Sequence, residues 1–128
     1  MPFIRITASG PTLAPEQVLR LQTEMTELMS SVLGKKANLT SVLVEQPAGA
    51  GWAIGGSTAR VAVHVNATIT TGTNSPEEKA RFIEQTMKLL KHVFGGELSP
   101  ATYVVIAEVP AQSWGYDGRT QESRRLAA

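Results

Sequence analysis

The chain has 128 residues, of which 42% are apolar and 18% charged, and its formal net charge is +1 at pH 7. This composition is typical of one soluble globular domain, and the scattered, balanced charges argue against a nucleic-acid or membrane partner. The absence of cysteine excludes disulfides and thiolate metal sites. The sequence shows no signal peptide, and no apolar run approaches the roughly 20 residues that a membrane span needs, so we expect a cytoplasmic protein.

The first predicted element is a strand over residues 2–8, where "PFIRITA" alternates apolar and polar side chains. Pro2 suits the start of a strand because proline has no backbone N–H to donate. A second interpretation is that removal of Met1 leaves Pro2 with a free secondary amine, which accepts a proton as an amide nitrogen does not. Both interpretations remain open at this point.

A one-sided helix is predicted over residues 15–33, with Pro15 in its first turn and Gly34 as its stop. A strand over residues 40–46, "TSVLVEQ", follows it. The next segment, "GAGWAIGG" at residues 49–56, resembles a dinucleotide-binding fingerprint, but that motif must open a helix, and a β-rich strand follows here. We therefore expect a glycine-rich hairpin or loop.

The second half of the chain repeats this order. We expect a strand over residues 60–70, a helix over 76–94 with Ser75 as its N-cap, a strand over 102–109, and a solvated tail over 120–128. The apolar stripe of the second helix is assigned to five residues: Ala80, Ile83, Met87, Leu90 and Phe94.

Several short segments of the two halves match at offsets of about 61 to 63 residues. "APEQ" at residues 14–17 matches "SPEE" at 75–78, "SVLG" at 31–34 matches "HVFG" at 92–95, and the segments ending at Trp52 and Trp114 also match. We interpret the chain as one domain, residues 1–128, with pseudo-repeats over 2–58 and 59–119 and a C-terminal tail over 120–128.

Two tandem strand–helix–strand units predict an α+β fold, in which a four-stranded mixed sheet carries both helices on one face. The other face has no cover within the chain. We expect its apolar residues, such as Val61, Val63 and Val65 or the residues opposite them, to require a partner, so the protein should be an oligomer.

Other residues offer few signals of chemistry. His64 and His92 are isolated and are interpreted as structural or surface residues, and no metal or cofactor motif is present. Trp52 and Trp114 fit either loop anchors or pocket residues.

With its penultimate proline, tandem units and "EQPAGAGWAIGG" hairpin, the chain resembles the tautomerase superfamily along nearly its whole length. The short members, such as 4-oxalocrotonate tautomerase, contain one unit. The long ones, such as macrophage migration inhibitory factor and cis-3-chloroacrylic acid dehalogenase, contain two. The resemblance implies a homotrimeric isomerase without cofactor, in which Pro2 is the catalytic base for a keto–enol shift in a small enol or keto acid.

The chain departs from its relatives at their charged positions. The substrate-binding arginines of the short tautomerases align with Thr12 and Leu43, and in the second half with Thr73 and Tyr103. The pocket aromatic survives as Trp52 and Trp114. Tyr103 and both tryptophans are therefore the substrate-binding candidates, and a doubly charged substrate is not expected.

The dehalogenase's catalytic groups are also replaced. Its histidine aligns with Met29, its carboxylate with Tyr116, and its paired arginines fall in an arginine-free loop at residues 70–74, which argues against hydrolytic dehalogenation. Arg119, after "WGYDG", matches an arginine of the dehalogenase and is the first choice for binding a carboxylate or oxyanion. Arg5 and Arg60 are weaker choices.

Two other functions remain open. One is a non-catalytic trimeric binding or structural protein of the same fold, which the missing arginines favour. The other is a promiscuous decarboxylase or hydratase of the superfamily. The residues do not name the substrate, and catalysis by Pro2 requires that Met1 be removed.

Overall fold

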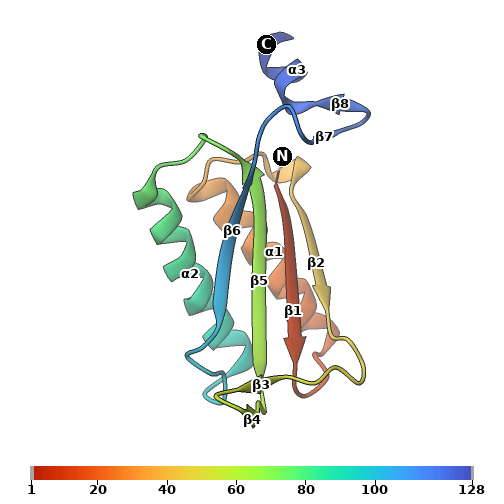
Figure 1. The fold of residues 1–128 in the computed structure, drawn as a ribbon. Coiled ribbons are helices and arrows are strands. Elements are labelled where there is room, and N and C mark those ends of the chain that lie inside the picture. Colours follow the sequence, from red (N-terminus) through yellow and green to blue (C-terminus); the bar gives the residue numbers. More distant parts are fainter. Residues whose placement is uncertain (1, 128) are drawn as a thin grey trace.

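The computed structural model describes residues 2–127 and forms one four-stranded sheet covered by two helices (Figure 1). In chain order the elements of the first half are β1 (Phe3–Ser9), α1 (Pro15–Ser31), a 3-10 turn η1 (Ala37–Leu39), β2 (Ser41–Glu45), β3 (Ala53–Ile54) and β4 (Ser57–Thr58). The second half contains β5 (Ala62–Thr70), α2 (Pro76–Phe94), β6 (Tyr103–Val109), β7 (Gly115–Tyr116), β8 (Arg119–Thr120) and α3 (Gln121–Ala127).

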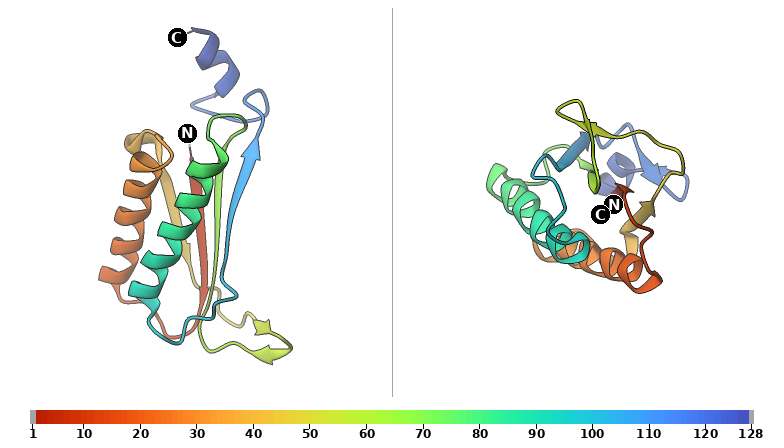
Figure 2. Two further views of the ribbon diagram at one scale, coloured as in Figure 1. Left: turned by 90° about the vertical axis from the view of Figure 1, so that its left-hand side faces the viewer. Right: turned by 90° about the horizontal axis from the view of Figure 1, so that it is seen from below.

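The sheet has the strand order β2-β1-β5-β6. β1 runs parallel to β2, with Phe3 beside Ser41, and antiparallel to β5, with Phe3 beside Thr68. β6 is parallel to β5, so each half is a parallel strand–helix–strand unit. The two units join through the antiparallel pair of β1 and β5. Both long helices lie on one face (Figure 2), which confirms the predicted α+β fold and mixed sheet.

The core lies between this face and the helices. Alternate residues of β1 and β5 point into it because successive side chains of a strand alternate between faces. Its fully buried members include Ile4, Ile6, Val65, Ala67, Ile69, Leu21, Met25, Met29, Phe82 and Leu90.

Of the two alternatives for the uncovered face, the one that places Val61, Val63 and Val65 there is wrong, and the one that places the opposite residues there holds. All three are buried, at 4% exposure or less, and belong to the core cluster under the helices. The residues opposite them in the alternation occupy the open face. Its exposed apolar members are Phe3, Leu43, Tyr103 and Val105.

The second helix has the expected bounds but a different buried face. α2 begins at Pro76 and ends at Phe94, and the Ser75 hydroxyl accepts the Glu78 N–H as predicted for an N-cap. Its buried residues are Phe82, Thr86, Leu89, Leu90 and Val93, whereas Ala80 and Ile83 of the predicted stripe are exposed. Only Leu90 belongs to both sets.

The C-terminal residues form more structure than a solvated tail. Residues 121–127 form α3, which follows the short β7–β8 hairpin and projects beyond the end of the sheet (Figure 1). No helix in residues 2–127 is long and apolar enough to cross a membrane.

Candidate active site

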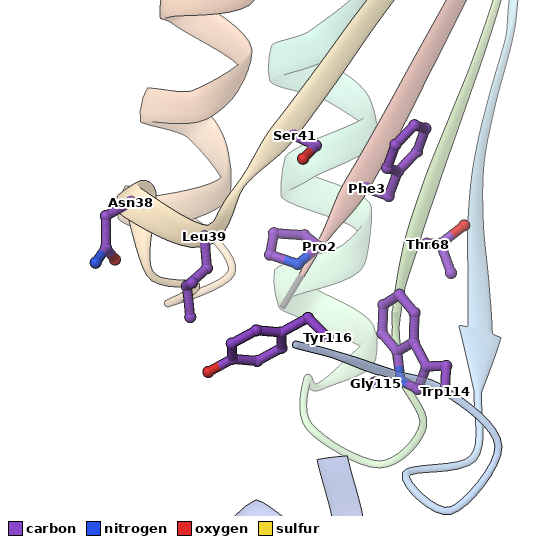
Figure 3. Close-up of a pocket in the computed structure, with 9 residues that line it drawn as sticks. All are labelled: Pro2, Phe3, Asn38, Leu39, Ser41, Thr68, Trp114, Gly115 and Tyr116. Atoms are coloured by element: carbon purple, nitrogen blue, oxygen red, sulfur yellow. The ribbon is translucent and has the colours of Figure 1, made fainter. Parts of the chain in front are cut away.

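A pocket of about 570 Å³ opens at the end of the sheet where β1 begins (Figure 3). The β1–β2 side contributes Pro2 and Phe3 together with the segment around η1, and the C-terminal hairpin contributes the opposite wall. Its lining residues are Pro2, Phe3, Asn38, Leu39, Ser41, Thr68, Trp114, Gly115 and Tyr116. None of these nine side chains is charged at neutral pH.

Pro2 is buried immediately before β1, and Figure 3 shows its ring among the other lining residues. Its carbonyl accepts the Ser41 N–H at 3.2 Å, which extends the β1–β2 pairing by one residue. Its nitrogen donates no hydrogen bond to the sheet, because proline within a polypeptide has no N–H. The strand therefore fixes Pro2 through its carbonyl and leaves its nitrogen free of the hydrogen-bond ladder.

Trp114 forms the wall that comes from the second half of the chain. Its indole Nε1 donates to Oγ1 of Thr70 at 3.1 Å, which ties the segment before β7 to the end of β5. The Trp114 carbonyl accepts the Gln121 N–H at 2.9 Å. The same residue thus connects the sheet, the pocket and the first residue of α3.

The β7–β8 hairpin closes through a tight two-residue turn. Asp117 and Gly118 have φ values of 50° and 75°, as the primed turns that join twisted antiparallel strands require. A Cβ on Gly115 would lie 1.9 Å from the Arg119 carbonyl oxygen, so no side chain fits at that position. The next residue, Tyr116, lines the pocket.

Of the nine lining residues, sequence reasoning selected only Pro2 and Trp114. The seven that it did not select are Phe3, Asn38, Leu39, Ser41, Thr68, Gly115 and Tyr116. The Asp-Gly pair in "WGYDG" is a hairpin signal that would have indicated β7 and β8, and therefore the position of Tyr116. Asn38 and Leu39 belong to η1, whose approach to Pro2 follows from the β1–β2 register.

Two of the cations near this end of the sheet, Arg119 and Lys35, donate to hydroxyl groups. Arg119 is exposed, does not line the pocket, and donates to the Ser123 hydroxyl at 3.1 Å. Lys35 is partly buried and its Nζ donates to Oγ1 of Thr73 at 2.7 Å. The pKa of Lys35 lies below its ordinary value of 10.5, because burial disfavours the ammonium form more than Glu78 and Glu108 favour it.

The other two aromatic candidates lie far from Pro2 within the chain. Tyr103 pairs with His64, which in turn pairs with Thr7, so it lies about five strand residues, or about 16 Å, along the sheet from Pro2. Trp52 precedes the β3–β4 hairpin at the same distant end (Figure 1).

That distant end carries a second cavity, of about 370 Å³, whose lining includes Ile54, Arg60, Val61 and Glu97. Arg60 is paired there with Glu97 at 3.4 Å. The other weak candidate, Arg5, lies 3.6 Å from Glu45. Residues 2–127 contain no group of three or more histidine, aspartate or glutamate side chains arranged to hold a metal.

Comparison with a family model described as "Tautomerase enzyme" gives two matches in this chain, over residues 2–61 and 63–124. The search of curated proteins found no match.

Solved structures share the fold at low sequence identity. One of Pt0534, described as inactivated by 2-oxo-3-pentynoate, has a TM-score of 0.84 at 14% identity, covering 95% of this chain and 98% of that one. A fused 4-OT named F6, described as an asymmetric trimer, has a TM-score of 0.81 at 18% identity over 95% and 98%. A macrophage migration inhibitory factor-like protein from Entamoeba histolytica has a TM-score of 0.77 at 21% identity over 93% and 97%.

Proposed function

The chain belongs to the tautomerase family, with one match in each half, and on this premise we propose that it is a cofactor-independent keto–enol tautomerase whose general base is an amino-terminal Pro2. The observation that carries the proposal is the position of Pro2, buried in the lining of a 570 Å³ pocket with a nitrogen that takes no part in the sheet. A proline that only started a strand would not need a pocket around it.

The chemistry follows from the properties of a buried amine. Once Met1 is removed, the Pro2 nitrogen has a lone pair. Burial disfavours the charged form of such an amine and so lowers its pKa from an α-amino reference near 7.7–8.0 or above. Such a base takes a proton from the enol oxygen or from the carbon beside a carbonyl. The electron pair moves through the enolate, and the same proton returns at the other end of the conjugated system.

The substrate class that fits is a small enol or α-keto acid with an apolar part. Trp114, Tyr116 and Leu39 offer apolar contacts. Arg119 remains our candidate for the carboxylate or oxyanion, because rotation away from Ser123 would free its guanidinium. Trp52 and Tyr103 lie too far from Pro2 to line the pocket of their own chain. In an oligomer they could contribute only to the Pro2 pocket of a neighbouring chain.

The test compares the processed protein with two variants in turnover of phenylenolpyruvate. We expect Pro2→Ala to lower turnover by about two orders of magnitude or more, since general-base catalysis contributes about 10²–10⁴-fold. A chain with residues added before Pro2 should lose at least as much, because its nitrogen becomes an amide. Mass spectrometry must first establish that the active sample lacks Met1.

Pro47→Ala serves as the matched control, because Pro47 is an exposed loop proline. It should retain full turnover. Equal rates in the Met1-retaining and processed proteins would overturn the proposal. Tight binding of an enol analogue without turnover in the processed protein would favour the alternative of a non-catalytic binding protein, which the uncharged pocket lining supports.

We also propose that the protein is a homotrimer joined through the open face of the sheet. Relatives of the same fold, including the fused 4-OT proteins F6 and Q0, are described as trimers. Sedimentation at micromolar concentration should give three chains per particle. Val105→Glu on the open face should dissociate the trimer, whereas Leu19→Glu, at an exposed position of α1, should not. A monomeric wild-type protein would contradict the proposal.

A further inference from the structure

Arg124 of α3 holds Tyr116 through two separate contacts. Its guanidinium carbon lies 3.8 Å from the centroid of the Tyr116 ring, and its Nη2 donates to the Tyr116 carbonyl at 2.9 Å. Its Nε is buried without a hydrogen-bond partner among the described residues. A buried donor without a partner is unfavourable, and the two contacts with Tyr116 offset that cost.

The helix that carries Arg124 is itself anchored to the hairpin. The Gln121 N–H donates to the Trp114 carbonyl and the Glu122 N–H to the Ala111 carbonyl, each at 2.9 Å, and the Ser123 N–H donates to the Thr120 hydroxyl at 3.0 Å. These bonds fix the start of α3 relative to β7 and β8. Arg124, one residue further on, therefore has a defined base from which to reach Tyr116.

Tyr116 is the link between this contact and the pocket. It lines the pocket that contains Pro2, and Figure 3 shows its side chain between Leu39 and Trp114. One face of its ring is occupied by the Arg124 guanidinium. Arg124 itself does not line the pocket, so any effect that it has on a bound molecule passes through the Tyr116 ring.

We propose that Arg124 is a positioning residue for the Pro2 pocket, which holds the Tyr116 ring as the wall against which the apolar part of the substrate packs. The expected effect on substrate binding rests on the proposed function, whereas the expected effect on the position of the Tyr116 ring does not. Without the guanidinium, the ring loses its stacking partner and the carbonyl loses its donor. The substrate then binds less tightly, while the base and its proton transfer are unchanged.

The first experiment needs no turnover. The chain contains two tyrosines, so protein labelled with 3-fluorotyrosine should give two ¹⁹F resonances, which Tyr103→Phe assigns. Arg124→Gln should shift the Tyr116 resonance and leave that of Tyr103 in place. Arg125→Gln is the matched control, because Arg125 is the next residue of α3, is exposed, and pairs with Glu122 instead. An unshifted Tyr116 resonance in Arg124→Gln, or an equal shift in Arg125→Gln, would overturn the proposal.

The second experiment measures kcat and KM for phenylenolpyruvate. We expect Arg124→Gln to raise KM by about tenfold, the factor that corresponds to a cation–π contact of ordinary strength. The pH profile of kcat should not move, since Pro2 is not touched. A change in kcat and its pH profile at constant KM would mean that Arg124 does not act through the pocket wall.

A double-mutant cycle separates positioning from a general effect on folding. In a Tyr116→Leu background, Arg124→Gln should cause no further rise in KM, because the ring on which it acts is gone. A further rise of the same size would overturn the proposal. If the wild-type protein turned over no enol at all, the proposed function would fail, and the ¹⁹F measurement would still decide whether Arg124 positions Tyr116.

Discussion

At the scale of single residues, the pocket is built from side chains that two distant parts of the chain supply. Pro2 was a candidate from the sequence because it follows Met1, whose removal would give it a free amine, and because the resemblance to tautomerases implies a base at this position. Trp114 was predicted because it repeats Trp52. Tyr116 was not selected, since nothing in its own type distinguishes it. Its role follows from the turn after it and from the contact with Arg124.

The bond between Trp114 and Thr70 yields the first prediction. Thr70→Val removes the oxygen that accepts the Trp114 Nε1–H, while it keeps the branched shape that suits a strand. A hydrogen bond contributes about 1 kcal/mol net, so we expect KM for an enol substrate to rise about fivefold with kcat unchanged. Steady-state kinetics measures this, and Thr70→Ser, which restores the acceptor, should recover the wild-type KM. A KM that stays constant in Thr70→Val would show that the bond does not hold the wall.

At the scale of elements, the two long helices begin differently, and this difference yields the second prediction. Ser75 caps α2 with its hydroxyl, whereas Ala14 at the same place before α1 has no side-chain acceptor. N-cap substitutions change stability by about 1 kcal/mol. Ser75→Ala should therefore lower the free energy of unfolding by that amount, and Ala14→Ser should raise it. Urea denaturation at one fixed protein concentration measures both, and a destabilised Ala14→Ser variant would contradict the argument.

The Glu78 carboxylate gives a third prediction, on pH. Its pKa lies below the ordinary value of 4.5, chiefly because it accepts the Ser75 N–H, with further help from Asn74. A carboxylate with a lowered folded-state pKa stabilises the fold above its unfolded pKa, and this stabilisation is lost as pH falls through the folded value. Wild type should thus exceed Glu78→Gln in stability at neutral pH, and the gap should close well below pH 4.5. A gap independent of pH would refute this.

The elements also show how much of the fold the sequence predicts. The positions of both long helices and all four sheet strands were predictable, because each has its own period and end signals. The buried face of α2 was not, because its apolar residues cover a wide arc and packing on the sheet selects Phe82 and Leu89 over Ile83. The position of α3 depends on hydrogen bonds to the hairpin, which no local pattern encodes.

At the scale of the whole molecule, the duplication predicts two related sites per chain, of which only the one at Pro2 has a basic nitrogen. The counterpart of Pro2 in the second half is Val63, which is 2% exposed and lies inside β5, where its nitrogen is an amide. An alkynyl keto acid that alkylates amines should therefore add once per chain. Peptide mass spectrometry should find the adduct on Pro2. Two adducts per chain, or adducts on lysines alone, would contradict the proposed base.

The near-twofold arrangement of the two halves has a consequence for the order of the polypeptide. Pro2 and α3 lie at the same end of the sheet, whereas the segment that leads into β5 lies at the other (Figure 1). A circular permutation that connected residue 127 to Pro2 through an added linker and opened the chain just before Val63 would keep the order of the strands in the sheet. It would also turn the Pro2 nitrogen into an amide and the Val63 nitrogen into an amine. Under the proposed function, the location of the basic nitrogen is thus decided by where the backbone is open.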